Sequence, residues 1–204
     1  MKEKITTMPN LLSDAPLHQA ALLNRNEHLA SWTYNVVDHF KHLTTAEIKA
    51  KLAETAFPYA ILCENVIGDF NLATIIRNAN AFNAREIFYV GNKKFDRRGT
   101  CGVHNYNDVQ WISSIEDLLS LKDKYVFVGV DNIPGAVSIS SHNWEKNTLL
   151  IFGEEGVGLT PTIQKLCDKM VYIEQYGSVR SLNVGTASGI IMHSIVNKFQ
   201  SFAE

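Results

Sequence analysis

The chain has 204 residues, of which 46% are hydrophobic and 20% charged, and its formal net charge is −2 at pH 7. This composition is typical of a globular domain and excludes an intrinsically disordered chain. No apolar run approaches the roughly 20 residues that cross a bilayer, so no membrane span is predicted. Because the net charge is close to zero, any nucleic-acid surface must be local.

The cysteines and the first residues indicate the compartment. Cys63, Cys101 and Cys167 are too few and too widely spaced for a disulfide framework or a zinc site. The first ten residues lack the apolar stretch of a signal peptide. We therefore expect a cytoplasmic protein without a metal, with Cys63 and Cys167 as small core residues.

Residues 1–57 differ from the rest, since they contain no Gly. Thr44 or Thr45 followed by Glu47 predicts a helix cap, and Ile48, Leu52 and Ala53 give a short apolar face. These patterns predict a helical N-terminal extension over 1–57, a candidate for RNA binding, before a second domain over 58–204.

Short apolar runs alternate with helical patterns in the second domain. The apolar runs predict strands over 59–65, 86–91, 109–112, 126–130, 148–153 and 170–174. The segments between them predict helices over 71–83, 114–123, 160–168 and 183–200. Apolar strands separated by helices indicate an α/β fold, with a parallel sheet covered by helices on both faces.

Two of these helices carry special residues. Asn71 is expected to cap the first, and Asn83 to end it in the left-handed conformation. Gly185 and Gly189, one turn apart in the last helix, indicate that another backbone packs very close to it; the alternative is an accidental small face.

Polar residues gather after three predicted strands, in Glu64–Arg77, 153–159 and 175–186. Ligands of open α/β sheets bind at such strand ends. The first strand is not followed by a dinucleotide-binding glycine pattern, and the chain has no P-loop, no nucleophile elbow and no HExxH. The glycines of 153–159, taken alone, fit a simple turn as well as a ligand loop.

Together the three segments resemble the motifs of one family, the SpoU/TrmH family of SPOUT RNA 2′-O-methyltransferases. The matching residues, in chain order, are Asn71 and Arg77, then Gly153, Glu155, Gly158 and Leu159, then Ile173 and Ser181-Leu182-Asn183-Val184. The resemblance covers about residues 58–200.

The resemblance implies a SPOUT α/β knot, in which the C-terminal part of the domain forms a trefoil knot, an exception to the rule that chains do not thread loops. It implies S-adenosylmethionine as the cofactor, held by the backbone at Gly153, Ile173 and Leu182. It also implies a homodimer formed through the first and last helices of the domain. The Gly185/Gly189 face suits either that contact or the knot.

The resemblance further implies catalytic roles. In this family, the Arg that matches Arg77 is given the role of accepting the proton of the ribose hydroxyl. Because a guanidinium stays charged, Arg77 is better suited to bind phosphate and orient the 2′-hydroxyl. Asn71 and Asn183 would orient Arg77, and Ser181 would contact the ribose or base. Glu155 would anchor its loop, pair with Arg77 or act as the alternative base.

RNA contacts are expected from a basic loop and from one further Arg, namely Lys93, Lys94, Arg97, Arg98 and Arg180. The sequence of segment 175–189 is closer to that of tRNA guanosine-methylating members, which favours tRNA slightly over rRNA as the substrate. Ile173-Glu174-Gln175 departs from the common Ile-Pro-Met of the family. The alternatives are a SPOUT base methyltransferase and a non-catalytic RNA-binding relic.

Overall fold

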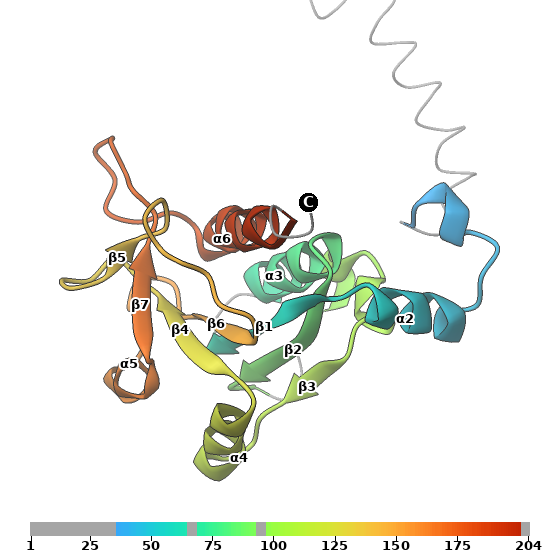
Figure 1. Ribbon diagram of the computed structural model, residues 1–204, viewed down its shortest axis with the longest axis horizontal. Helices are drawn as coiled ribbons and strands as arrows, with labels where there is room; N and C mark the ends of the chain where they lie inside the picture. Colours follow the sequence, from blue (N-terminus) through green and yellow to red (C-terminus); the bar gives the residue numbers. More distant parts are fainter. Residues whose placement is uncertain (1–35, 65–68, 93–96, 201–204) are drawn as a thin grey trace, which may run out of the picture. The chain divides into compact units, whose positions relative to one another are not determined.

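The protein is described by a computed structural model that covers residues 36–64, 69–92 and 97–200 (Figure 1). Its strands are β1 (Phe57–Glu64), β2 (Ala84–Val90), β3 (Val109–Trp111), β4 (Val126–Val130), β5 (Val137–Ser138), β6 (Thr148–Phe152) and β7 (Lys169–Tyr172). Its α-helices are α2 (Thr45–Glu54), α3 (Asp69–Ala81), α4 (Ile115–Ser120), α5 (Pro161–Leu166) and α6 (Val184–Gln200). Short 3₁₀ turns are η1 (Asp38–Phe40), η2 (Arg97–Thr100), η3 (Val103–Asn105) and η4 (Leu121–Asp123).

The strands form one seven-stranded sheet in the order β3-β2-β1-β6-β4-β7-β5, and every neighbouring pair is parallel. The predicted parallel α/β sheet is therefore confirmed, and each predicted strand is present. β5 escaped prediction because it has only two residues. β6 is buried along its whole length near the centre of the sheet, which explains its continuous apolar run.

Helices cover both faces of the sheet, as predicted. One buried cluster joins α3 and α6 to side chains such as Ile61, Ile87 and Leu150. A second cluster joins α4 and α5 to the alternate side chains of the same strands, such as Leu62, Leu149 and Ile151. Figure 1 shows α3 and α6 together on one side of the sheet and α4 and α5 on the other.

Helices α3 and α6 pack against each other through small residues. A Cβ added at Gly185 would lie 2.9 Å from the side chain of Thr74, and one at Gly189 would lie 3.3 Å from that of Asn78. Asn78 also donates from Nδ2 to the backbone oxygen of Gly185 and to Ser188 Oγ, each at 2.9 Å. The predicted close neighbour is therefore present, and it is α3 of the same chain, but the nearest atoms belong to side chains and not to a backbone.

The two expectations about the ends of α3 differ in outcome. Asn71 does not cap the helix, because α3 begins at Asp69 and Asn71 lies inside its first turn. Asn83 has φ of 44°, the left-handed conformation expected where the helix stops. Its Nδ2 donates to the backbone oxygen of Leu52 and thereby also ties α2 to this turn.

The described part of the N-terminal extension packs with the sheet domain. Thr44 and Glu47 form the predicted capping box of α2. Ile48 is buried with 3% of its surface exposed, whereas Ala53 is exposed. The chain forms one compact unit from Val37 onward, so α2 lies with the sheet although the sequence assigned it to the extension. The rest of that predicted extension, residues 1–35, lies outside the described residues.

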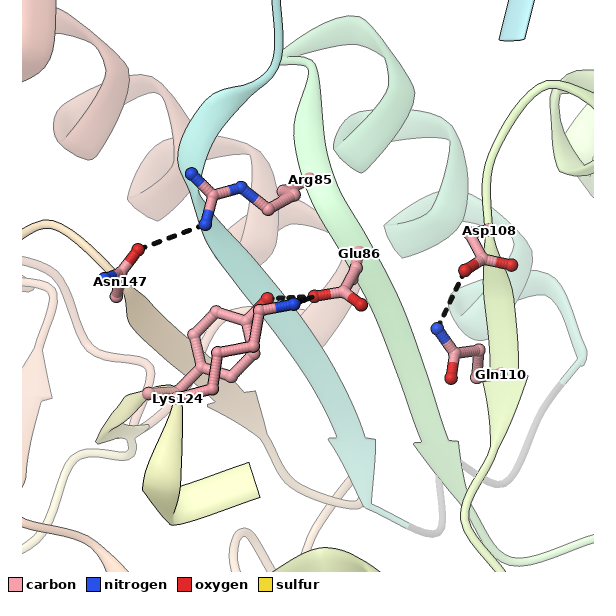
Figure 2. A network of polar contacts seen from close by, with 7 residues as sticks. Arg85, Glu86, Asp108, Gln110, Lys124 and Asn147 are labelled. Carbon is pink, nitrogen blue, oxygen red and sulfur yellow. Dashed lines mark hydrogen bonds and ion pairs between the residues drawn. The ribbon is translucent and has the colours of Figure 1, made fainter. Parts of the chain in front are cut away.

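Polar contacts join the amino-terminal ends of the strands (Figure 2). Lys124 and Tyr125, just before β4, both donate to Glu86 on β2. Arg85 donates from Nη1 to Asn147 Oδ1, 3.1 Å away, before β6. Burial, together with Glu86, raises the pKa of Tyr125. This edge is held by ion pairs and hydrogen bonds, and the polar strand ends singled out in the sequence lie at the opposite edge.

Within the described ranges, no helix is long and apolar enough to cross a bilayer. The same residues contain no cluster of three or more His, Cys, Asp or Glu side chains that could hold a metal ion. Cys63 is buried and Cys167 half-buried, as expected of core residues, and burial raises the pKa of both thiols.

Candidate active site

A cavity of about 420 Å³ lies at the carboxyl ends of β4, β6 and β7 and the start of α6. This volume falls in the range of small-molecule sites, roughly 300–1,000 Å³. Its wall includes seven of the residues that the sequence proposed for the site, namely Gly153, Glu155, Ile173, Arg180, Ser181, Leu182 and Asn183. Folding thus brings the second and third predicted segments to one cavity.

The segment after β6 is a tight turn that closes on itself. Glu154 and Gly158 exchange backbone hydrogen bonds of 3.0 and 2.9 Å. Gly156 and Gly158 have φ of 83° and 76°, which side-chain-bearing residues rarely adopt. A Cβ at Gly153 would lie 2.3–2.4 Å from backbone atoms of Gly158 and Leu159. The absence of a side chain at Gly153 is therefore required by this turn, whereas the sequence suggested a close approach of the cofactor.

Two carboxylates accept hydrogen bonds from the residues at the end of this turn. Asp131 Oδ2, just after β4, accepts a hydrogen bond from the backbone N of Leu159 at 3.0 Å. Glu64, at the end of β1, is buried and accepts hydrogen bonds from both the backbone N and the hydroxyl of Thr160. Thr160 also caps α5. Glu64 therefore holds the loop in position, although its place in the sequence grouped it with the first predicted ligand segment.

A polar chain joins the first, second and third predicted segments. Asn71 Nδ2 donates to Glu155 Oε1, and Asn71 Oδ1 accepts from Asn183 Nδ2 at 2.9 Å. Asn183 Oδ1 accepts from the backbone N of Thr186 at 3.2 Å and so caps α6. The side-chain nitrogen of Asn71 thus bonds to Glu155, and its side-chain oxygen bonds to Asn183. The expected orientation of Arg77 by these asparagines is not seen within this chain.

The cavity is rich in hydrogen-bond acceptors. Asp131, Glu154 and Glu155 line it, and Arg180 is the cation among the lining residues. Glu155 Oε2 and Gln175 Oε1 are buried without a hydrogen-bond partner. Since buried polar atoms are nearly always paired, these oxygens indicate a ligand that donates hydrogen bonds.

Arg77 is not among the residues that line the cavity. It is exposed on α3, and its Nη1 lies 3.5 Å from Cys101 Sγ. Cys101 directly follows η2, which packs on α3 where a Cβ at Gly99 would lie 2.8 Å from Ala73 Cβ. The fold therefore places Arg77 beside the segment that carries Arg97 and Arg98. Lys93 and Lys94 lie outside the described residues.

Sequence reasoning missed two polar residues of the cavity wall. Asp131 and Asn132 follow β4, and Asn132 donates from Nδ2 to the backbone oxygen of Arg180 at 3.3 Å. The available signal was position, because Asp131 and Asn132 come directly after a predicted apolar strand, as the chosen segments do.

The model of the SpoU rRNA Methylase family matches residues 58–193. The chain belongs to the SpoU methylase family. The family match spans β1 to the middle of α6, and so contains the cavity and all three motifs on which the sequence resemblance was based.

Two RNA methyltransferases are similar in sequence to this chain. A tRNA (guanosine(18)-2′-O)-methyltransferase of Aquifex aeolicus is 28% identical over 139 residues, which are 65% of this chain and 66% of that enzyme. The 23S rRNA (guanosine-2′-O-)-methyltransferase RlmB of Acinetobacter baylyi is 36% identical over 138 residues, 64% of this chain and 56% of that enzyme. The match thus covers just under two thirds of the first relative and little more than half of the second.

Solved structures of SpoU methylases have the same fold. The TrmH/SpoU tRNA modifying enzyme of A. aeolicus superposes with a TM-score of 0.70 at 23% identity, covering 79% of this chain and 87% of that one. AviRb of Streptomyces viridochromogenes, in complex with AdoMet, superposes with a TM-score of 0.65 at 25% identity, covering 70% and 58%.

Proposed function

We propose that the chain is an S-adenosylmethionine-dependent methyltransferase that modifies a ribose 2′-hydroxyl of structured RNA, with tRNA ahead of rRNA. The single observation that carries this proposal is the cavity at which two family motifs meet, joined through Asn71 to the third. The named relatives act on guanosine 2′-oxygens of tRNA or 23S rRNA, which supports the same chemistry here.

The cavity suits S-adenosylmethionine. The lining carboxylates of Asp131, Glu154 and Glu155 outnumber the guanidinium of Arg180, which favours a cation. The unpartnered oxygens of Glu155 and Gln175 call for hydrogen-bond donors, which the cofactor carries on its ammonium, ribose and adenine. A relative of the same family, AviRb, holds AdoMet. The residues that would hold the cofactor are Gly153, Ile173 and Leu182, through their backbone groups.

When bound, the cofactor supplies a methyl group on a sulfonium sulfur, which a ribose oxygen can displace. The protein's part is mainly to hold the two reactants in line, worth up to roughly 7–11 kcal/mol. Ser181 and Asn183, on the cavity wall, would position the ribose. Glu155 lines the cavity and would be the alternative base for the proton of the hydroxyl.

The role proposed for Arg77 requires a second copy of the chain. Arg77 does not line the cavity of its own chain, so we propose a homodimer in which α3 and α6 form the interface and Arg77 serves the partner's site. Phe70 on α3 has 72% of its surface exposed and Ile190 on α6 has 37%, and such exposed apolar side chains on both helices support the contact.

Two further parts of the proposal concern RNA capture and chain topology. The neighbouring Arg77, Arg97 and Arg98, with Arg180 at the cavity, would bind phosphates. Lys93, Lys94 and residues 1–57 are further candidates for RNA binding on sequence grounds. We also propose that the loops 152–160 and 173–183 form the trefoil knot implied by the family, which is supported by their meeting at one cavity.

The proposal is tested by incubating the full chain with radiolabelled S-adenosylmethionine and total RNA from its own source. We expect label in an RNA linkage that resists alkali, because a methylated 2′-oxygen cannot attack the neighbouring phosphate. Primer extension at low nucleotide concentration then maps the position. Label that appears on a base would favour the base methyltransferase, and absence of both transfer and cofactor binding would favour the RNA-binding relic.

A further inference from the structure

Gln175 lies in the loop that follows β7, where the chain departs from the common Ile-Pro-Met of the family. The preceding residue, Glu174, is anchored, because its carboxylate accepts hydrogen bonds from the hydroxyls of Ser138 and Ser140 beside β5. The following residue, Tyr176, has 95% of its surface exposed. The backbone is therefore held at Glu174, with Gln175 on the cavity wall and Tyr176 in solvent.

The side-chain oxygen of Gln175 is buried and accepts no hydrogen bond. Among the residues that the structure describes, this state is shared only by Glu155 Oε2, and both residues line the same cavity. Burying an amide oxygen without a donor destabilises a protein, and native structures rarely keep such an atom without a use. Two of them on residues that line one cavity are explained together by a ligand that donates to both.

The two oxygens differ in charge, and this difference assigns them different donors. A carboxylate such as Glu155 suits a hydroxyl whose proton is leaving, or a cation. An amide oxygen carries no net charge, so it attracts a cation less strongly than a carboxylate does and suits a neutral amino or hydroxyl donor. On the basis of the proposed function, we infer that Gln175 accepts a hydrogen bond from a neutral donor of S-adenosylmethionine, on its adenine or ribose, and so selects ligands that carry this donor.

Gln175→Met tests the inference, because Met is close to Gln in size and lacks the amide. We expect the Kd for S-adenosylhomocysteine, measured by calorimetry on the full chain, to rise at least tenfold, about 1.4 kcal/mol. We expect the Tm of the ligand-free protein to stay the same or rise, because an unpaired buried oxygen is removed. Gln175→Glu keeps an acceptor oxygen and should restore most of the affinity.

Gln110→Met is the matched control. Gln110 lies on β3 and donates to Asp108 Oδ2 at 2.8 Å, on the opposite edge of the sheet (Figure 2). The same substitution there should leave the Kd unchanged. If Gln175→Met binds with the affinity of the wild-type chain, the inference is overturned while the proposed function stands. If Gln175→Met lowers the Tm of the ligand-free protein together with affinity, Gln175 is structural and the inference also fails.

Ligand derivatives identify the donor. The 6-oxo, 2′-deoxy and 3′-deoxy derivatives of S-adenosylhomocysteine each lack one neutral donor. We expect one of these derivatives to bind the wild-type chain at least tenfold more weakly than S-adenosylhomocysteine itself. Gln175→Met should bind that derivative and S-adenosylhomocysteine with about equal affinity. Equal discrimination by the wild-type chain and Gln175→Met for all three would overturn the inference. Failure of the wild-type chain to bind the parent compound would instead remove the proposed function, and the inference with it.

Discussion

Asn183 donates from Nδ2 to Asn71 Oδ1 at 2.9 Å, and this bond joins positions 112 residues apart in the sequence. It links the start of α6 to the first turn of α3, and Asn71 passes the link on to Glu155 on the cavity wall. The asparagines of the first and third motifs therefore act on the carboxylate of the second. The sequence resemblance implied instead that they would orient Arg77.

The first prediction concerns Asn71. In Asn71→Ala, Glu155 loses the donor to its Oε1, so both carboxylate oxygens are left without the partner seen here. We expect methyl transfer to fall at least tenfold. Asn80→Ala, on the same helix, removes the 2.8 Å bond to Asn107 Oδ1 away from the cavity and is the control for stability. Equal activity of the two variants would contradict the role of the Asn71 link.

The second prediction separates cofactor binding from transfer at Arg77. Because Arg77 does not line the cavity of its own chain, Arg77→Ala should bind S-adenosylmethionine with a Kd within about threefold of the wild-type value. Transfer to RNA should fall at least a hundredfold. Arg85→Ala, which removes the contact to Asn147 at the far edge (Figure 2), should keep both. Full transfer activity of Arg77→Ala would remove Arg77 from the mechanism.

The third prediction concerns the turn after β6. A Cβ at Gly153 would lie within 2.4 Å of the backbone of Gly158 and Leu159, so Gly153→Ala must displace that turn. Overpacking of this kind costs about 1–3 kcal/mol. This cost corresponds to roughly 2–12 °C of Tm in a chain of this size. Gly177→Ala, where a Cβ meets nothing within 4 Å, should leave Tm unchanged. Differential scanning calorimetry compares the two, and equal Tm values would refute this account of Gly153.

The fourth prediction concerns stability and pH. Burial, with a smaller contribution from Arg97, lowers the pKa of His104 below its ordinary value of 6.5, and burial likewise lowers that of His142. The folded state then binds fewer protons than the unfolded state, so stability from these groups is full above pH 6.5 and is lost as pH falls through the lowered pKa values. We expect Tm to decrease from pH 7.5 towards pH 5.5.

Substitution of His104 checks this assignment. His104→Asn keeps a polar group near the hydroxyl of buried Thr100 and cannot be protonated in this range. Its Tm should therefore depend less on pH between 7.5 and 5.5 than the Tm of the wild-type chain. A Tm of the wild-type protein that rises on acidification would show that the sign is wrong.

The sequence by itself determined the sheet, its helices and the family. The apolar runs of β4 and β6 are local patterns, readable because strands buried on both faces need apolar residues at successive positions. The left-handed Asn83 and the capping box of Thr44 and Glu47 are also local, and both were predicted. Motif order was sufficient to identify seven residues of the cavity wall.

Only the tertiary structure decided which residue serves which partner. Glu64 and Asp131 support the turn at Leu159–Thr160, and Gly185 packs against Thr74 of the same chain. These partners come from different strands and helices, and sequence spacing carries no information about which strand ends become neighbours. The order β1-β6-β4-β7 sets those neighbours, and it brings Gln175 to the cavity while leaving Arg77 outside it.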